Sequence, residues 1–278
     1  MLYVLAAALS ITCLSLIMRY ATLKTQTLWG VILGNYITAA AIMGTLILRA
    51  GSTQVSTFTL TLGAITGFTY SAGMYLNLTL MGKRGAAITS SMIQLAVLIP
   101  ITVSVFFYAE TINTQQLTGI LLAVSSLPLL ASKPMQKLEI DREILPMILI
   151  TILVVGFSQL SSKILIQSGY GAQNNYFFLA IFTSASILVT PFAWRNRQKI
   201  KRKDAAYGFG VGLFNMMSNM SLLIALTTIP GSIVFPVSSA GSLLLVTISA
   251  IILFKEKVSK LNLLGILLTL IAVVLINI

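Results

Sequence analysis

The chain alternates long apolar runs with short polar segments along its whole length. Each run holds about 20 residues, the number that a helix needs to cross roughly 30 Å of hydrocarbon at 1.5 Å per residue. The pattern predicts ten membrane-spanning segments, at residues 2–18, 28–48, 57–81, 85–108, 115–132, 144–167, 173–194, 205–228, 230–254 and 259–277.

Helices are the secondary structure that these runs predict. A backbone exposed to lipid must satisfy its hydrogen bonds within one helix or within a closed barrel, and the runs are about twice as long as a barrel strand. We therefore expect an all-α integral membrane protein with ten transmembrane helices.

The composition agrees with this prediction. The chain is 57% hydrophobic and 9% charged, whereas soluble globular proteins carry roughly 25% charged residues. A net charge of +12 would suggest a nucleic-acid partner for a soluble protein. Here the basic residues lie in the short gaps between apolar runs, where the cytoplasmic bias of membrane proteins places them. We expect the lipid bilayer as a partner and no nucleic acid.

The two halves of the sequence resemble each other. Displacing the chain by 146 residues, without gaps, aligns three pairs of residues: Gly85 with Gly231, Glu110 with Glu256, and Gly119 with Gly265. The glutamate pair is the informative one, because the chain has only 6 acidic residues.

Two glycine pairs extend the correspondence. Gly63 and Gly67 in the third run have the same spacing as Gly208 and Gly212 in the eighth run, at a displacement of 145 residues. Small residues four positions apart allow helix backbones to approach closely.

We therefore predict a duplicated five-helix unit. The first repeat is 1–132, a cytoplasmic linker covers 133–143, and the second repeat is 144–278. An odd number of spans makes the second unit enter the membrane from the opposite side, so the expected fold is two inverted five-helix repeats. Inverted repeats are a recurrent plan of secondary transporters, because two halves of opposite orientation can expose one site to each side in turn.

The distribution of basic residues predicts the orientation. Of the 18 Lys and Arg residues, all except Arg49 and Lys163 lie on one side of the predicted helices, in the first, third, fifth, seventh and ninth connections or the helix ends beside them. The positive-inside rule places this side in the cytoplasm of a cell membrane and both termini outside.

Several segments are similar to those of a known family. These are Gly85 through Pro100 to Glu110, then Leu117–Leu122, with second-half counterparts Gly231–Pro236, Leu253–Glu256 and Leu263–Ile266, together with the pair Asn35 and Tyr36. In these segments the chain resembles the drug/metabolite transporter superfamily, in its ten-helix EamA-type branch. The resemblance implies two inverted bundles around a central cavity lined mainly by the first, third, fourth, sixth, eighth and ninth helices. Members of that branch usually have both termini in the cytoplasm, so the charge distribution here departs from the family pattern.

The sequence contains no pattern of residues that is typical of a catalytic site. It contains no histidine and one cysteine, Cys13, and its acidic residues form no metal-binding pattern. We expect neither an enzyme nor a cofactor or metal.

The charged residues near helix ends have two interpretations each. Glu110 and Glu256 are expected to cap the N-termini of the fifth and tenth helices, or to act in gating or coupling. Lys163 is expected either to extend to the membrane interface or to face the cavity beside Gln159 as a partner for an anion. The absence of acids in mid-membrane disfavours antiport of lipophilic cations.

Neutral polar residues are the better candidates for solute binding. Asn215 and Asn219 share a helix face at i and i+4. The resemblance places further candidates on cavity helices: Tyr70, Asn77, Gln94, Ser238, Ser239 and Ser242. Each could equally form a hydrogen bond between helices. Pro100 and Pro236 are expected to kink the fourth and ninth helices, and Gly119 and Gly265 to serve in packing.

These observations predict a secondary transporter that moves a small polar metabolite, neutral or zwitterionic and resembling an amino acid, by alternating access. The alternatives are a flippase for a lipid or lipid-linked intermediate, and a membrane accessory subunit that transports nothing. The protein is expected to be a monomer or a homodimer.

Overall fold

The computed structural model describes residues 1–51, 54–84, 95–131, 145–254 and 259–277. Within these residues the chain is helical and has no strand. The helices are α1 (Leu2–Lys24), α2 (Trp29–Ala50), α3 (Thr57–Arg84), α5 (Leu98–Phe106), α6 (Thr114–Ala131), α7 (Leu145–Gln167), α8 (Asn174–Arg195), α9 (Arg202–Thr228), α10 (Gly231–Phe254) and α11 (Lys260–Asn277).

Each predicted apolar run contains one of these helices, so the all-helical prediction is confirmed. Six of the helices in the described residues are long and apolar enough to span a membrane on their own, namely α1, α2, α7, α8, α9 and α10. The apolar segments Leu95–Phe106 and Leu263–Ala272 are shorter.

Helix α9 begins at Arg202, before the start of the predicted span 205–228. The predicted boundary places Asp204 in the preceding basic connection, but Asp204 lies in the first turn of α9 and is fully buried. Its carboxylate accepts a hydrogen bond of 3.0 Å from the backbone N–H of Lys201. An acidic side chain at this position satisfies a free N–H and complements the positive end of the helix, which extends the helix backwards.

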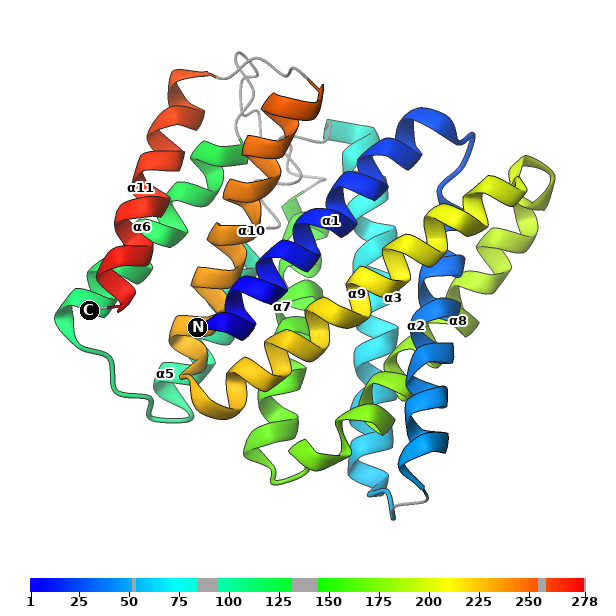
Figure 1. The fold of residues 1–278 in the computed structure, drawn as a ribbon, viewed down its shortest axis with the longest axis horizontal. Coiled ribbons are helices and arrows are strands. Elements are labelled where there is room, and N and C mark those ends of the chain that lie inside the picture. The colour runs from blue at the N-terminus through cyan, green and yellow to red at the C-terminus, as the bar shows by residue number, and fades with distance from the viewer. Residues whose placement is uncertain (52–53, 85–94, 132–144, 255–258, 278) are drawn as a thin grey trace.

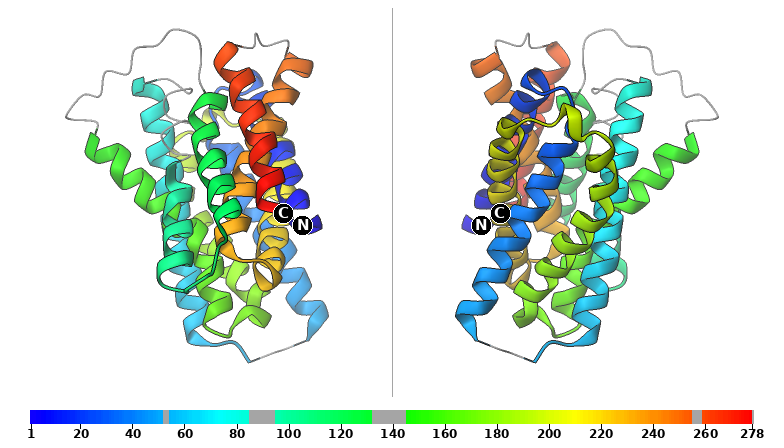
Figure 2. Two further views of the ribbon diagram at one scale, coloured as in Figure 1. Left: turned by 90° about the vertical axis from the view of Figure 1, so that its left-hand side faces the viewer. Right: turned by 90° about the vertical axis from the view of Figure 1, so that its right-hand side faces the viewer.

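Consecutive helices run in alternating directions, and the described connections, such as those between α1 and α2 and between α7 and α8, lie at two opposite ends of the bundle (Figures 1 and 2). The main packing interfaces join a helix of the first half to a helix of the second half. These interfaces are α6 with α11, α1 with α9, α2 with α9, α3 with α8, α2 with α8, α3 with α7 and α1 with α10. The core is therefore built between the two halves.

Glycines allow two of these interfaces to be close. A Cβ atom added to Gly208 on α9 would lie 2.9 Å from the carbonyl oxygen of Val31 on α2. A Cβ atom added to Gly63 on α3 would lie 2.7 Å from the carbonyl oxygen of Phe177 on α8. Phe177 follows Val31 by 146 residues. The two crossings thus use corresponding backbone atoms.

The second glycine of each pair repeats this correspondence. A Cβ atom on Gly212 would lie 2.6 Å from the carbonyl oxygen of Asn35, and one on Gly67 would collide with the carbonyl oxygen of Ile181. Ile181 again follows Asn35 by 146 residues. The close helix approach expected from the two glycine pairs is present at both crossings.

These contacts predict the effect of adding one methyl group. Gly208→Ala and Gly63→Ala should each lower the free energy of unfolding by about 1–3 kcal/mol, because backbone atoms would have to move apart. Thermal unfolding of the purified protein in detergent would measure this loss.

Gly44→Ala on α2 is the matched control, since a Cβ atom at Gly44 meets nothing within 4 Å. This substitution should leave the unfolding temperature unchanged or raise it slightly. Equal effects at all three glycines would show that the crossings are not tightly packed.

Candidate functional site

Four polar side chains from three helices form a hydrogen-bonded group inside the bundle, which we call the asparagine cluster: Asn35 on α2, Tyr70 on α3, and Asn215 and Asn219 on α9. Asn215 is 3% exposed. Its side-chain N–H donates to the amide oxygen of Asn35 at 3.0 Å. Its own amide oxygen accepts from the Tyr70 hydroxyl at 3.1 Å. The cluster therefore joins both halves of the chain.

Asn219 completes the cluster on the same face of α9. Its side-chain N–H donates to the side-chain oxygen and the backbone oxygen of Asn215, both at 2.8 Å. The buried ring of Tyr36 meets the ring of Tyr70 edge to face, at 6.1 Å between centroids. Amides and a hydroxyl can both donate and accept hydrogen bonds, so the cluster satisfies itself here and can exchange those bonds for a polar solute.

The cluster lies against an apolar and aromatic core. Tyr70, Met216 and Met220 pack against a cluster of buried side chains that includes Tyr36 and Phe182. In this conformation the amides therefore bond to one another inside a well-packed region.

A buried ion pair lies at one end of the bundle, where α7 meets the start of α10. The Lys163 ammonium is 3% exposed and pairs with the Glu110 carboxylate. The same carboxylate accepts hydrogen bonds from the backbone N–H groups of Gly231 at 2.9 Å and Ser232 at 2.8 Å. We call these four residues the Glu110 clasp. It ties a first-half side chain to two second-half helices.

The clasp corrects two expectations. Lys163 neither extends to the interface nor awaits an anion, because Glu110 already neutralises it. Glu110 caps α10 and not α6, the fifth helix of the chain. The start of α6 is capped instead by Asn113 and Gln116, each of which accepts a hydrogen bond from the other's backbone N–H, at 2.7 and 3.1 Å. This local pair leaves Glu110 free to reach α10.

The environment of Glu110 shifts its ionisation. Burial by itself would raise the pKa of the carboxyl, but the hydrogen bonds from Lys163 and from the backbone of Ser232 and Gly231 outweigh it and lower the pKa below its ordinary value. The stability that the clasp contributes is therefore complete above the ordinary carboxyl pKa and is lost as the pH falls through the lowered value.

Two hydroxyl groups beside the clasp have no hydrogen-bond partner among the residues that the structure describes. They belong to Ser104 on α5 and Ser232 on α10, and both residues are fully buried. A Cβ atom added to Gly231 would collide with the Ser104 hydroxyl, so the two helices meet closely here. Unsatisfied buried hydroxyls are uncommon in native structures, and they indicate that this junction has unused hydrogen-bonding capacity.

A second polar contact joins the halves at the same end. The side-chain oxygen of Gln173, between α7 and α8, accepts from the backbone N–H of Ser56 at 3.0 Å and from the hydroxyl of Thr59 at 2.6 Å. The opposite end is closed by stacked rings. The ring centroid of Trp29 on α2 lies 4.9 Å from that of Phe192 on α8. The ring centroid of Tyr75 on α3 lies 5.5 Å from that of Phe192.

The remaining candidates are not joined to either group by a recorded bond. Ser238 and Ser242 donate to backbone oxygens of their own helix, at Phe235 and Ser239. Gln159 is half-buried on α7. The buried amide oxygen of Asn77 has no hydrogen-bond partner within the described ranges of the chain. Gln94 and Glu256 lie outside the described residues.

The two prolines differ in their setting. Pro100 lies in the first turn of α5, directly after the short 3-10 turn Leu95–Val97. It therefore stands at the start of the described helix instead of bending its middle, because a first-turn residue needs no intrahelical N–H. Pro236 lies inside α10. Gly119 and Gly265 are buried on α6 and α11, the two helices that pack on each other.

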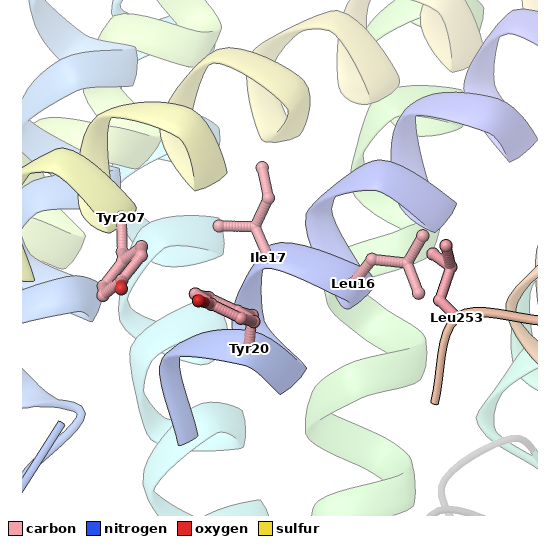
Figure 3. A pocket seen from close by; sticks show the side chains of 5 residues that line it. All are labelled: Leu16, Ile17, Tyr20, Tyr207 and Leu253. Carbon is pink, nitrogen blue, oxygen red and sulfur yellow. The ribbon is translucent and has the colours of Figure 1, made fainter. Parts of the chain in front are cut away.

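The described residues also form a cavity of about 410 Å³ that none of the predicted site residues lines. It lies between α1, α9 and α10, and its walls are Leu16, Ile17, Tyr20, Tyr207 and Leu253 (Figure 3). Apart from the two tyrosine hydroxyls, these walls are apolar. No group of three His, Cys, Asp or Glu side chains in the described part of the chain could hold a metal ion.

Comparison with known proteins identifies the family of the second half. Residues 143–278 match the model of the EamA-like transporter family. These residues are therefore similar to the EamA-like transporter family, whose members carry small solutes. This agrees with the resemblance to the drug/metabolite transporter superfamily, and the long apolar helices of the described residues support a multi-pass membrane protein. Members of the EamA-like family are typically not enzymes.

Solved structures share the fold of this chain. Of 28 matching chains, one that is described only as "Crystal structure of protein" has a TM-score of 0.81 at 12% sequence identity. The similarity covers 99% of this chain and 94% of that one. A search of curated proteins finds no match.

The Glu110 clasp makes a prediction about stability. Lys163→Met should lower the free energy of unfolding by roughly 3 kcal/mol, because it leaves a carboxylate without its cation in a largely buried site. The double variant Lys163→Met/Glu110→Gln should recover a large part of that loss. Thermal unfolding in detergent near neutral pH would measure both.

Lys199→Met removes a charge from an exposed position between α8 and α9 and serves as the control. Its unfolding temperature should match that of the unmodified protein. A double variant no more stable than Lys163→Met would contradict the assignment of the loss to an unpaired carboxylate.

Proposed function

We propose that this protein is a secondary transporter that moves a small polar metabolite, neutral or zwitterionic, across the cytoplasmic membrane by alternating access. The asparagine cluster is the observation that carries the proposal. It is a polar group at the junction of the two halves of a membrane protein whose residues 143–278 match the model of a transporter family.

Inverted repeats are an architecture that many secondary transporters use for alternating access, and residues 1–132 and 144–278 are the proposed repeats. Three observations support this. Each proposed repeat contributes five described helices. The glycines of α9 contact carbonyl oxygens of α2, and the glycines of α3 contact carbonyl oxygens of α8 that lie 146 residues further along the chain. The interfaces also occur in exchanged pairs, such as α1 with α9 and α3 with α7.

The chemistry of the cluster favours a polar solute without net charge. Three amides and a hydroxyl offer donors and acceptors of hydrogen bonds, and no charged side chain takes part in the recorded bonds. A solute that carries both donors and acceptors can replace the bonds between Tyr70, Asn215 and Asn219 at little cost. A lipophilic cation would leave the amides and the hydroxyl of the cluster without hydrogen-bond partners.

The two ends of the bundle supply the gates in this proposal. The Glu110 clasp and the Gln173 contacts close one end, and the rings of Trp29, Tyr75 and Phe192 close the other. Each set includes side chains from both proposed repeats, so each must separate when its end opens. From the basic residues, we place the clasp end and both termini outside the cell.

Uptake into proteoliposomes tests this function. Purified protein should accumulate at least one radiolabelled member of a panel of amino acids, sugars and nucleobases. Asn219→Ala should raise KM by about tenfold, the cost of one hydrogen bond of about 1.4 kcal/mol. Its unfolding temperature should change little, because the bonds from Asn215 to Asn35 and Tyr70 remain.

Asn196→Ala is the matched control, because the Asn196 side chain donates only to a backbone oxygen at the exposed end of α8. Its KM should be unchanged. Failure of the whole panel, or an Asn219→Ala protein with unaltered KM, would overturn the proposal. The former result would favour an accessory subunit that transports nothing.

A lipid flippase is the second candidate, because the apolar cavity between α1, α9 and α10 has the exposed side chain of Leu253 in its wall. Proteoliposomes with a fluorescent phospholipid, quenched from outside by dithionite, separate the two functions. Loss of the protected fluorescence in a protein-dependent manner would favour the flippase.

A further inference from the structure

The apolar cavity between α1, α9 and α10 has the form of a groove on the side of the helical bundle. Tyr20 is 45% exposed and Leu253 is 64% exposed, although both line the cavity. In a membrane protein, such exposed apolar walls face lipid. Leu16, Ile17 and Tyr20 come from α1, and Tyr207 and Leu253 come from α9 and α10 (Figure 3).

The two tyrosines mark one end of the groove. Their rings meet edge to face at 5.9 Å between centroids. Tyr20 lies one helical turn before Lys24, near the end of α1, and Tyr207 lies one turn after Lys203, near the start of α9. Tyrosine is enriched at the level of lipid headgroups, where its ring is apolar and its hydroxyl is hydrated. This end of the groove is therefore at the membrane interface.

Two ammonium groups lie beside these tyrosines. The Lys24 ammonium is 5.8 Å from the centre of the Tyr20 ring. The Lys203 ammonium donates a hydrogen bond of 2.6 Å to the backbone oxygen of Lys24. Both lysines are exposed. The nearest acidic residue along α9, Asp204, is fully buried and turned to the backbone N–H of Lys201. Two basic side chains therefore lie at the tyrosine end of the groove.

We propose that this groove binds an anionic phospholipid, with an acyl chain against Leu16, Ile17 and Leu253 and the phosphate between Lys24 and Lys203. The apolar walls exclude a hydrated solute, and the paired lysines favour a headgroup with net negative charge over a zwitterionic one. Basic residues beside an apolar groove at the membrane surface are the usual recognition elements for such lipids.

The bound lipid has a mechanical consequence. Tyr20 and Lys24 belong to the first half of the chain, whereas Tyr207 and Lys203 belong to the second half. A lipid that contacts all four of these residues connects the two halves at the end opposite the Glu110 clasp. It therefore stabilises the arrangement in which α1 lies against α9. Binding of the lipid does not depend on which solute, if any, the protein carries.

Native mass spectrometry and thermal unfolding of the full chain test the site, with phosphatidylglycerol and phosphatidylcholine of identical acyl chains added separately to the protein in detergent. Phosphatidylglycerol should stay bound at higher collision energies than phosphatidylcholine does. It should also raise the unfolding temperature more. Lys24→Ala and Lys203→Ala should each weaken phosphatidylglycerol binding about fivefold, the effect of about 1 kcal/mol for each basic residue near a lipid surface.

The control removes the same charge elsewhere. Arg197→Ala/Lys199→Ala is matched to Lys24→Ala/Lys203→Ala, and the Arg197 guanidinium is already stacked on Trp194, 4.8 Å from its ring centre. The control should retain the preference for phosphatidylglycerol. Leu16→Trp, which fills the groove and keeps both lysines, should weaken the binding of both lipids.

Equal stabilisation by the two lipids, or an unchanged preference in the Lys24→Ala/Lys203→Ala protein, would overturn the proposal. If the double lysine variant does not fold, the Leu16→Trp protein decides, and undiminished binding of phosphatidylglycerol to it would equally overturn the site. These outcomes are independent of solute uptake, so they can fail or succeed apart from the transport function.

Discussion

The close approach of two helix pairs at glycines is the constraint on which the rest of the structure depends. Gly208 and Gly212 bring α9 against α2, and Gly63 and Gly67 bring α3 against α8. No side chain separates the backbones at these positions, so residues that follow the glycines are carried to the centre of the bundle. Dispersion contacts and interhelical hydrogen bonds, instead of hydrophobic burial, provide the driving force for such packing within a bilayer.

The asparagine cluster follows directly from this geometry. Tyr70 lies three residues after Gly67, and Asn215 lies three residues after Gly212. The two crossings thus place corresponding positions of α3 and α9 opposite each other, and there the Tyr70 hydroxyl donates to Asn215. Asn35, whose backbone contacts Gly212, is brought within hydrogen-bonding distance of Asn215 by the same approach. The polar centre is therefore a product of the helix packing.

Much of this arrangement could be predicted from the sequence because its signals are local or repeated. Apolar runs of helical length indicate the ten helices, and the shared face of Asn215 and Asn219 follows from their spacing. The partners of these residues were not predictable in this way. Only the resemblance to a known family distinguishes Asn35 in the sequence, and nothing local indicates its bond to Asn215. The contact of Glu110 with the start of α10 joins residues that are 121 positions apart. Asn113 and Gln116 have the spacing of a capping box, so the sequence does carry a signal for the cap of α6. It carries none for the partner that Glu110 then finds on α10.

Movement of the two halves against each other is the central claim, and a reversible cross-link at the clasp end tests it most directly. Ser56→Cys and Gln173→Cys, in a chain with Cys13→Ala, place one thiol on each of the two segments that the Gln173 side chain now joins to the Ser56 backbone at 3.0 Å, and a short bis-methanethiosulfonate reagent links the two thiols through reducible disulfides. Uptake of a transported solute should stop when the disulfide forms and return when it is reduced, while each single cysteine variant stays active under both conditions. Undiminished uptake with the disulfide in place would show that this end does not open, and would contradict the account.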